Sequence, residues 1–449
     1  MAKSVIGEKS VKDLSRLHRI FLLVLVSMGS SIIYTPAYLK NVFYDPLIKA
    51  LHASNAQIGQ LLAAYALTAT ICYLPSGIVA DKVRVRTLSW VGFVGTAALT
   101  FVYAFLPSIA VLYIVFVGMG ITSILIWWGV RFKLVRLISE ESEYSRNIGI
   151  SYGLYGAAGL VVGLVILWIV QSLFAGNTVG GVRAMLIFLG VIIGLLGVLS
   201  YMFIPKFEGE IDPTKSSFDF GEVLDALKSP VVWLAAGCMF FVYFYYTGIN
   251  YTTPYFKDVM GASLGVVSFV SIVRTYGVTL LSGPIFGTIA EKVGSPSKVI
   301  VGGSVVAVAG LVAFTVLPAK PASAFVAAGI MIVLGFLANG VFGVVSSQLT
   351  EGKVPLTIFG TATGLLSVIG FLPDSFSSIW FGAMIDAQGN DAYHGIFLIL
   401  AGAAVIAALF AVALLVYVSR NKAKLENAQQ EAAEAVAENV EEGRKCLTR

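Results

Sequence analysis

The stretch YTPAYLKNV, from Tyr34 to Val42, recurs as YTTPYFKDV from Tyr251 to Val259. The two stretches agree at five of nine positions, including both tyrosines and the lysine, and they begin 217 residues apart. Each one lies at the end of a long apolar run. This recurrence indicates that the chain contains a duplicated unit, and that both copies end their first apolar segment in the same way.

The composition is that of a membrane protein. The 449-residue chain is 57% hydrophobic and only 12% charged, whereas soluble proteins carry about 25% charged residues. The apolar residues come in runs of 20 or more, which is long enough for a helix to cross about 30 Å of hydrocarbon. The fold class is therefore expected to be all-α and polytopic, and the net charge of +5 gives no reason to invoke nucleic acid.

Twelve apolar runs are predicted to span the membrane. Their approximate bounds are 17–39, 55–80, 86–106, 109–131, 147–173, 183–204, 230–253, 264–289, 298–317, 322–346, 357–384 and 394–418. The runs are continuous rather than alternating, which argues against the strands of a β-barrel. The first run is expected to be retained as a span and not removed as a signal peptide.

The distribution of lysine and arginine predicts the topology. Of the 30 such residues, 24 fall on the side of the N-terminus, five fall on the other side, and Arg274 lies within a span. Positive charge is retained on the cytoplasmic face of membrane proteins. Both termini are therefore expected to be cytoplasmic.

Two further repeats support duplication of a six-helix unit. GIVADKV, from Gly77 to Val83, matches GTIAEKV at an offset of 210, and IGISYGLYGAAG, from Ile148 to Gly159, matches FGTATGLLSVIG at an offset of 211. Two parallel halves of this kind build one large class of secondary transporters, with the site at their interface. The expected division is a first bundle at 1–204, a central loop at 205–229, a second bundle at 230–420 and a polar cytoplasmic tail at 421–449.

The loop between the second and third predicted spans reads GIVADKVRVR from Gly77 to Arg86. Its glycine, the acid four residues later and the basic cluster resemble the loop signature of the major facilitator superfamily, and a weaker copy at 287–298 lies where that superfamily places one. The resemblance covers about residues 15–420 and implies two six-helix bundles. The chain departs from the signature at Arg84, where glycine is usual.

This loop also suggests a gate. Gly77 is expected to let its span approach a neighbour closely, and Asp81 is expected to meet a helix N-terminus and basic side chains. These contacts would hold the cytoplasmic side shut. The predicted gating residues are Gly77, Asp81, Lys82, Arg86 and Glu291. In the alternative interpretation, the basic residues only anchor the loop inside.

Arg274 lies about eleven residues from the outer end of its span, which is near the bilayer centre and too deep for its side chain to reach water. Buried arginines in membranes usually mark a pathway. A guanidinium suits a carboxylate, phosphate or sulfonate, so Arg274 is the predicted anchor of an anionic solute. The alternative is that Arg274 is a structural partner of a carboxylate.

Asp374 is the matching acid and directly follows Pro373 within a span. Proline weakens a helix and frees backbone groups, so Asp374 could simply cap the broken turn. The functional interpretation is a protonatable group that couples proton movement to transport, or a counter-ion for Arg274.

The repeated stretches supply further candidates. Lys40 and Lys257 each end a span on the outer side, where a lysine can reach water or attract an anion. Tyrosines of the repeats lie four residues apart and share a helix face. The remaining substrate-binding candidates are Tyr34, Tyr38, Tyr245, Asn250, Tyr251 and Trp127, and Trp128, Arg131, Tyr152, Tyr255 and Asn339 are considered beside them.

The segment PYFKDV at the end of the seventh span also resembles the organophosphate-antiporter branch of the superfamily. That branch carries phosphate-binding arginines in its first and seventh spans, and the neighbouring YFYYTGINY has none. The resemblance therefore implies an organic-anion branch with a different cationic anchor, Arg274.

The predicted function is secondary active transport of a small organic anion of carboxylate, sulfonate or sugar-acid type, by proton symport in a bacterial inner membrane. No enzyme signature, Walker motif or cysteine and histidine metal spacing is present, so neither catalysis nor a cofactor is expected. The partners are expected to be the solute, protons and lipid, with the protein a monomer. The alternatives are a neutral sugar or drug carrier in which Arg274 and Asp374 pair structurally, and a sensor that has lost transport.

Overall fold

The computed structural model describes residues 8–140, 143–211, 224, 226–318, 320 and 323–427. Most of the predicted central loop, at 212–223, and most of the polar tail, at 428–449, lie outside the described residues.

Helices dominate the first half of the chain. They are η1 (Val11–Asp13), α1 (Arg16–Ile32), α2 (Thr35–Tyr38), α3 (Lys40–Leu51), α4 (Asn55–Lys82), α5 (Val85–Ala104), α6 (Ile109–Gly120), η2 (Ile121–Ile126), α7 (Trp128–Leu137), α8 (Tyr144–Trp168), η4 (Ile169–Leu173) and α9 (Thr178–Phe203).

The second half is built in the same way. Its helices are α11 (Pro230–Gly248), η5 (Ile249–Tyr251), α12 (Thr252–Asp258), α13 (Leu264–Ile272), η6 (Val273–Gly277), α14 (Thr279–Val293), α15 (Pro296–Val316), α16 (Ala324–Val345), α17 (Gln348–Glu351), α18 (Leu356–Gly370), η8 (Leu372–Ser375), α19 (Ser377–Gln388), η9 (Gly389–Asp391) and α20 (Ala392–Arg420).

Each of the twelve predicted spans is matched by helix. Within the described residues, ten helices are long and apolar enough to cross a membrane, or eleven if α4, which bends by 58° between Tyr73 and Pro75, is included. The ten include the stretch Thr361–Arg420 as a single helix. This stretch turns back at η9 and contains both α19 and α20, so it holds two spans. The predicted all-α polytopic fold is confirmed.

The repeated stretches mark equivalent breaks in two helices. Tyr34 is the N-cap residue of α2, which follows α1 after a turn, and Tyr251 is the N-cap residue of α12, which follows α11 after the 3₁₀ turn η5. Proline in each stretch favours the break, because it lacks the N–H that would continue the hydrogen-bond ladder. The same sequence pattern therefore interrupts the first helix of each half.

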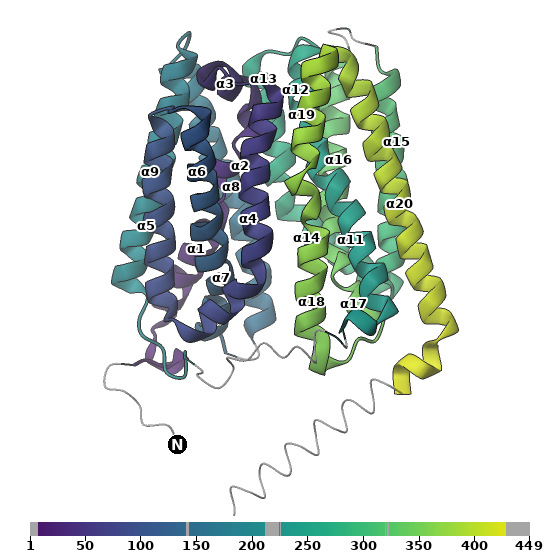
Figure 1. Cartoon of the computed structure of the whole chain (residues 1–449). Coiled ribbons are helices and arrows are strands. Elements are labelled where there is room, and N and C mark those ends of the chain that lie inside the picture. Colours follow the sequence, from purple (N-terminus) through teal and green to yellow (C-terminus); the bar gives the residue numbers. More distant parts are fainter. Residues whose placement is uncertain are drawn as a thin grey trace, which may run out of the picture.

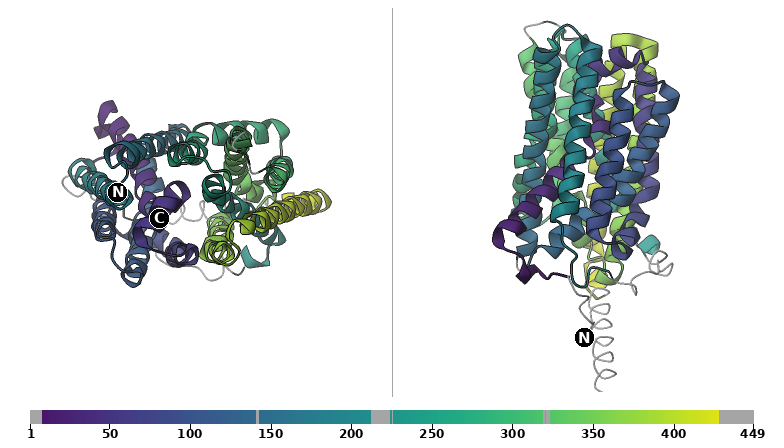
Figure 2. Two further views of the ribbon diagram at one scale, coloured as in Figure 1. Left: turned by 90° about the horizontal axis from the view of Figure 1, so that it is seen from above. Right: turned by 90° about the vertical axis from the view of Figure 1, so that its left-hand side faces the viewer.

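Buried apolar side chains form two clusters, one for each half of the chain. The first contains residues of α1–α9 with few exceptions, and the second contains residues of α11–α20. Figure 1 shows the corresponding groups of helices side by side, and the view from above in Figure 2 shows the same two groups. We call these groups the N-terminal bundle and the C-terminal bundle.

Helix α1 begins and α20 ends on the same side of the molecule (Figure 1). We call this side the inner face, because the lysine and arginine counts predict that it is cytoplasmic. The opposite side, where α4 begins and α19 ends, is called the outer face.

The two bundles are closely packed at the outer face. A side chain on Gly59 of α4 would overlap the backbone at Ser378, and one on Gly382 of α19 would come within 2.7 Å of the Asn55 carbonyl carbon. Backbones can approach this closely only where small residues face each other. Helices α4 and α19 therefore seal the outer end of the interface.

Glycines nearer the inner face lack such close contacts. A β-carbon on Gly77, also in α4, would meet nothing within 4 Å, and the same holds for Gly149, Gly153, Gly283 and Gly287. The prediction that Gly77 packs closely against a neighbour is wrong for this conformation, because the close glycine contact of α4 is at Gly59 instead. The closest contacts between the bundles therefore lie at the outer face, and the molecule is called outward-closed below.

Asp386, near the end of α19, joins the two bundles at the outer face. Its carboxylate accepts hydrogen bonds from the backbone N–H of Asn55 at 3.0 Å and of Ala56 at 2.8 Å, and from the Asn55 side-chain amide at 2.7 Å. These N–H groups belong to the first turn of α4, where the helix dipole favours a negative charge. Asp386 thus fixes the closed outer end.

Asp386→Asn should open the outer face. The loss of charge weakens a charge-assisted interaction with a helix N-terminus by about 1 kcal/mol, so the ratio of outward-closed to outward-open molecules should fall about fivefold. His52 and His394 are exposed residues at the outer ends of the two bundles. Spin labels at these positions, in a cysteine-free background, would report the distance between the two bundles at the outer face. Asp391→Asn is the matched control, since exposed Asp391 makes no side-chain cap at α20. An unchanged distance distribution in Asp386→Asn would contradict this role.

Candidate functional site

Arg274 lies in η6, a π-helical turn within the eighth span, and is 3% exposed. Its Nη1 donates to the Ile249 carbonyl at 3.0 Å and to Thr252 Oγ1 at 2.8 Å, while Nη2 donates to Asn250 Oδ1 at 2.7 Å and to the Asn41 carbonyl at 2.9 Å. The break at η5 leaves carbonyl groups without helical partners. Arg274 therefore supplies the hydrogen bonds that this break requires, and it also reaches the N-terminal bundle at Asn41.

These surroundings change the interpretation of Arg274. Its acceptors are neutral, and no ion pair joins it to a carboxylate in the described part of the chain. The expectation that Asp374 is its counter-ion or structural partner is therefore wrong for this conformation. The expectation that Arg274 anchors the solute stays a prediction, but the hydrogen-bonding groups needed for that role are already engaged.

Asp374 lies in η8, where Pro373 interrupts the eleventh span, and its side chain is buried. One carboxylate oxygen, Oδ2, accepts a hydrogen bond from Tyr38 Oη at 3.0 Å and another from Tyr243 Oη at 2.7 Å. The N-cap residue of the following helix, α19, is Phe376 and not Asp374. Tyr38 belongs to the N-terminal bundle and Tyr243 to the C-terminal bundle, so Asp374 is shared across the interface.

Lys40 is the cation that acts electrostatically on Asp374. It is 6% exposed, and its Nζ donates to Ser378 Oγ at 2.8 Å and to Tyr251 Oη at 3.4 Å. The expectation that Lys40 reaches water at the outer end of the span is wrong, because the helix continues as α3 as far as Leu51 and covers it.

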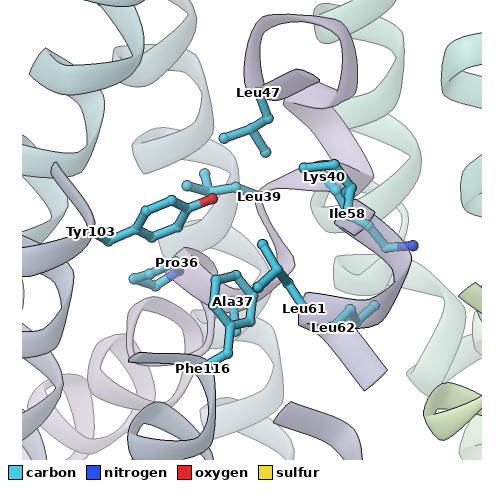
Figure 3. A pocket seen from close by; sticks show the side chains of 10 residues that line it. All are labelled: Pro36, Ala37, Leu39, Lys40, Leu47, Ile58, Leu61, Leu62, Tyr103 and Phe116. Atoms are coloured by element: carbon cyan, nitrogen blue, oxygen red, sulfur yellow. The ribbon is translucent and has the colours of Figure 1, made fainter. Parts of the chain in front are cut away.

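Lys40 also borders an apolar pocket lined by Pro36, Ala37, Leu39, Leu47, Ile58, Leu61, Leu62, Tyr103 and Phe116. Figure 3 shows that the Lys40 amino group points away from Tyr103 and Phe116. The other lining residues carry no charge, and the Lys40 amino group is hydrogen-bonded to Ser378 and Tyr251 of the opposite bundle. Its repeat counterpart Lys257 is partly exposed near the end of α12, so the two lysines of the repeat have different surroundings.

Arg131 lies in α7 and is a buried cation of a different kind. It is 5% exposed, and no ion pair joins it to a carboxylate among the described residues. Its guanidinium carbon lies 4.5 Å from the ring centre of Tyr152 and 5.4 Å from that of Tyr155, both in α8. These ring contacts stabilise the charge in part, but Nη2 has no hydrogen-bond partner.

A second unpaired donor lies near Arg131. The Tyr34 hydroxyl is buried and has no hydrogen-bond partner, and the Arg131 charge acts on it electrostatically. The ring of Tyr34 contacts that of Trp128, with 6.5 Å between centroids. Arg131 and Tyr34 therefore bring two unsatisfied donors to one region of the N-terminal bundle.

Two predicted substrate contacts lie inside a bundle instead. Trp127 is fully buried against Phe93, with 4.3 Å between ring centroids. Tyr245 is also fully buried, and its hydroxyl lies 3.5 Å from Ser304 Oγ within the C-terminal bundle. Neither side chain is exposed in this conformation, and their role in solute binding stays a prediction.

Their sequence neighbours face the interface. Tyr243 contacts Asp374, and Tyr246 accepts a hydrogen bond from the Asn339 amide at 3.4 Å. The spacing of Tyr243, Tyr246 and Asn250 by three and four residues places all three on one face of the helix. That spacing was the signal in the sequence that could have identified this face.

The other predicted polar contacts are held by neighbours. Tyr251 donates to the Ser378 carbonyl at 3.0 Å, and the Asn250 amide donates to the Thr247 carbonyl at 2.9 Å. Asn339 accepts from Ser282 at 2.8 Å. These side chains support the interface rather than offer free donors to it.

The predicted gating residues make contacts within their own bundle. Asp81 lies 3.7 Å from Lys133 Nζ, and the Arg86 guanidinium stacks over Tyr201 at 4.6 Å. Lys82 ends α4, and Glu291 lies exposed near the end of α14. Their gating role stays a prediction, since the contacts of Asp81 and Arg86 do not join the two bundles.

Arg84, the departure from the loop signature, has its own partners. It pairs with Glu8 at 2.6 Å and with Glu210 at 3.5 Å, and the hydrogen bond to Glu8 raises the pKa of the Arg84 guanidinium. Glu210 also caps α5 by accepting from the Val85 N–H. The arginine therefore ties the N-terminal segment and the segment after α9 to the inner face.

Known proteins resemble this chain in sequence. A family model described as Major Facilitator Superfamily matches residues 20–378. Inner membrane protein YqcE of Escherichia coli (strain K12) is 30% identical over 359 residues, which cover 79% of this chain and 84% of that protein. Inner membrane protein YihN of the same organism is 24% identical over 409 residues, which cover 89% of this chain and 96% of that protein.

Solved structures share the fold. A bacterial homologue of the human lysosomal transporter Spinster, in an inward-facing and unoccupied conformation, aligns with a TM-score of 0.71 at 16% identity over 89% of this chain and 98% of its own. The nucleoside transporter NupG aligns with a TM-score of 0.69 at 17% identity over 89% of this chain and 99% of its own. With the family match over most of its length, this chain belongs to the Major Facilitator Superfamily and is a multi-pass membrane transporter, not an enzyme.

Proposed function

We propose that this transporter carries a small organic anion across the membrane together with protons, by alternating access of the interface to the two faces. The observation that carries the proposal is the buried Arg131 guanidinium, which has ring neighbours, no carboxylate partner in the described part of the chain and an unpaired Nη2. The unpaired Tyr34 hydroxyl in the same region supports it.

The energetic argument concerns these two donors. A buried donor without a partner costs about 1–3 kcal/mol, and a hydrogen bond to a charged group contributes about 1.5–3 kcal/mol. An anion that accepts from Arg131 and Tyr34 removes the cost and gains the bond. The planar guanidinium favours carboxylate and sulfonate groups, which accept two parallel hydrogen bonds.

Tyr152 covers one side of the Arg131 guanidinium. Its ring lies over the Arg131 guanidinium and is 45% exposed. An anion that approaches from this side would therefore displace this ring before it reaches the guanidinium. Tyrosine can move aside at low cost, because only its partly solvated contact with the arginine is lost.

Asp374 is suited to couple protons to this movement. In the outward-closed form its carboxylate accepts from Tyr38 of one bundle and Tyr243 of the other. Opening of the outer face must separate Tyr38 and Lys40 from Asp374, which would leave a charged group with fewer partners in the membrane. A proton from outside removes that cost, so Asp374 should bind a proton more readily in the outward-open form than in the outward-closed form.

Arg131→Gln should abolish high-affinity anion binding. The loss of a charge-assisted hydrogen bond of about 1.5–3 kcal/mol corresponds to a decrease in affinity of about tenfold to a hundredfold. This decrease in affinity would be measured from the uptake of a panel of carboxylates and sulfonates into proteoliposomes with an acidic exterior. Arg146→Gln is the matched control, because Arg146 is exposed and pairs only with nearby Glu143 among the described carboxylates.

Arg274→Gln provides the contrast within this experiment. If Arg274 stabilises the break in the seventh span and joins it to Asn41 of the first span, Arg274→Gln should change the maximal uptake rate more than the affinity for the anion. If Arg274→Gln loses affinity while Arg131→Gln keeps it, the anion is held at Arg274 and the assignment to Arg131 fails.

Asp374→Asn should uncouple transport from protons. The amide keeps the shape of the side chain but cannot gain or release a proton at physiological pH, so accumulation driven by a pH gradient should be lost. Exchange of labelled for unlabelled anion at equal pH should continue, since exchange requires no net proton movement. Asp391→Asn is the control for loss of a carboxylate. Full gradient-driven accumulation in Asp374→Asn would rule out Asp374 as the coupling acid.

A further inference from the structure

We infer that the transported anion carries a ring, and that the ring is received by an aromatic surface between the anion anchor and Asp374. The inference rests on the proposed function and adds the class of solute. We call this surface the aromatic wall, and it consists of Tyr73, Trp128, Tyr243, Tyr246, Phe342 and Phe371.

The wall is continuous and crosses from one bundle to the other. Trp128 contacts Tyr73 in the N-terminal bundle, with 5.1 Å between ring centroids. Tyr73 contacts Phe371 of the C-terminal bundle at 5.2 Å, and Phe371 contacts Tyr243 at 4.7 Å. The rings therefore form a path across the interface rather than two separate clusters.

The remaining two rings widen the wall in the C-terminal bundle. Tyr246 and Phe342 are stacked, with 4.9 Å between centroids and 6° between ring planes. Phe342 also lies 5.5 Å from Tyr243 and 6.1 Å from Phe371. Four rings from three helical elements thus share one side of the interface.

The six rings are neither core nor lipid-facing. All are partly exposed, whereas core rings such as Phe93 and Phe397 are fully buried, and Phe325 on α16 is 89% exposed. Aromatic side chains that pack in a bundle core lose nearly all of their accessible surface. Intermediate exposure of every member indicates that the wall borders a space within the interface.

The ends of the wall are the two charged groups of the proposed mechanism. At one end the Trp128 ring contacts Phe132 at 5.7 Å, and the Arg131 guanidinium lies 5.5 Å from the same Phe132 ring. At the other end Tyr243 donates to Asp374 at 2.7 Å. An anion held by Arg131 would therefore extend along the rings toward the coupling acid.

The chemistry of the wall favours a ring over an open chain. Aromatic faces stack on flat surfaces, either another π-system or the C–H face of a saturated ring. A flexible chain would lose more conformational freedom to make the same contact. Tyr246 Oη, which accepts from Asn339, keeps its own hydrogen for donation to a substituent of the ring. The ring can come from a cyclic sugar acid or from a hydrocarbon ring acid.

Matched pairs of monocarboxylates separate these possibilities. Glucuronate is compared with gluconate, its open-chain counterpart with the same number of carbons, and benzoate and cyclohexanecarboxylate are compared with heptanoate. Each probe competes with uptake in proteoliposomes that contain the full chain. The ring member of one set should inhibit about tenfold more strongly than its open-chain partner, and the set in which this occurs identifies the source of the ring.

Variants of the wall test the assignment. Trp128→Ala and Phe371→Ala should bring the ratio of ring to chain inhibition close to one, whereas Trp128→Phe, which keeps a ring and guards against a folding defect, should retain the preference. Phe325→Ala is the control for loss of an aromatic side chain. Arg131→Gln should weaken inhibition by every anion.

Two outcomes would overturn the inference. If open-chain acids inhibit as strongly as ring acids, or if Trp128→Ala weakens both classes equally, the wall does not select a ring, while the Arg131-dependent anion site stands. If no probe inhibits in an Arg131-dependent manner, the proposed function and the inference both fail.

Discussion

The closed outer half of the interface depends on one short segment of the first span, in which the polar groups of Tyr38, Lys40 and Asn41 are paired with the opposite bundle. Tyr38 donates to Asp374, Lys40 donates to Ser378, and the Asn41 carbonyl accepts from Arg274 and from Thr253. Polar groups in a membrane interior must find partners within the protein. Movement of this segment therefore has to be matched by new partners, and water or a proton at the outer face can supply them.

The two buried arginines illustrate how partners decide function. Arg274 and Arg131 have almost the same exposure, but the guanidinium of Arg274 is saturated with neutral acceptors, whereas that of Arg131 has rings on its faces and an unpaired Nη2. A saturated arginine stabilises a fold, while an unsaturated one has capacity left for a ligand. In this account the same residue type serves at one place as a structural support and at another as the anchor of the solute.

Hydropathy was sufficient to predict the spans, because these follow from the cost of exposing polar groups to lipid. The recurring stretches were sufficient to predict the internal repeat. The orientation of individual side chains could not be predicted in the same way. Helix α11 is apolar on all sides, so its pattern does not distinguish Tyr245, which faces its own bundle, from Tyr243, which faces the interface. The burial of Lys40 could not be predicted because the polar residues that follow it suggest the end of a span. In the structure the helix continues beyond Lys40, and the lysine is buried. Arg131 could not be distinguished from the other candidates by sequence, since its lack of a hydrogen-bond partner is a property of the packed structure.

The central claim is that the solute binds at the unsatisfied cation of the N-terminal bundle. The most direct measurement is a cryo-EM structure of the full chain with the anion from the carboxylate and sulfonate panel that raises its melting temperature most. The account predicts density for the anionic group within hydrogen-bond distance of the Arg131 guanidinium and the Tyr34 hydroxyl, with Tyr152 displaced. Density at Arg274, with Arg131 still covered by the Tyr152 ring, would contradict it.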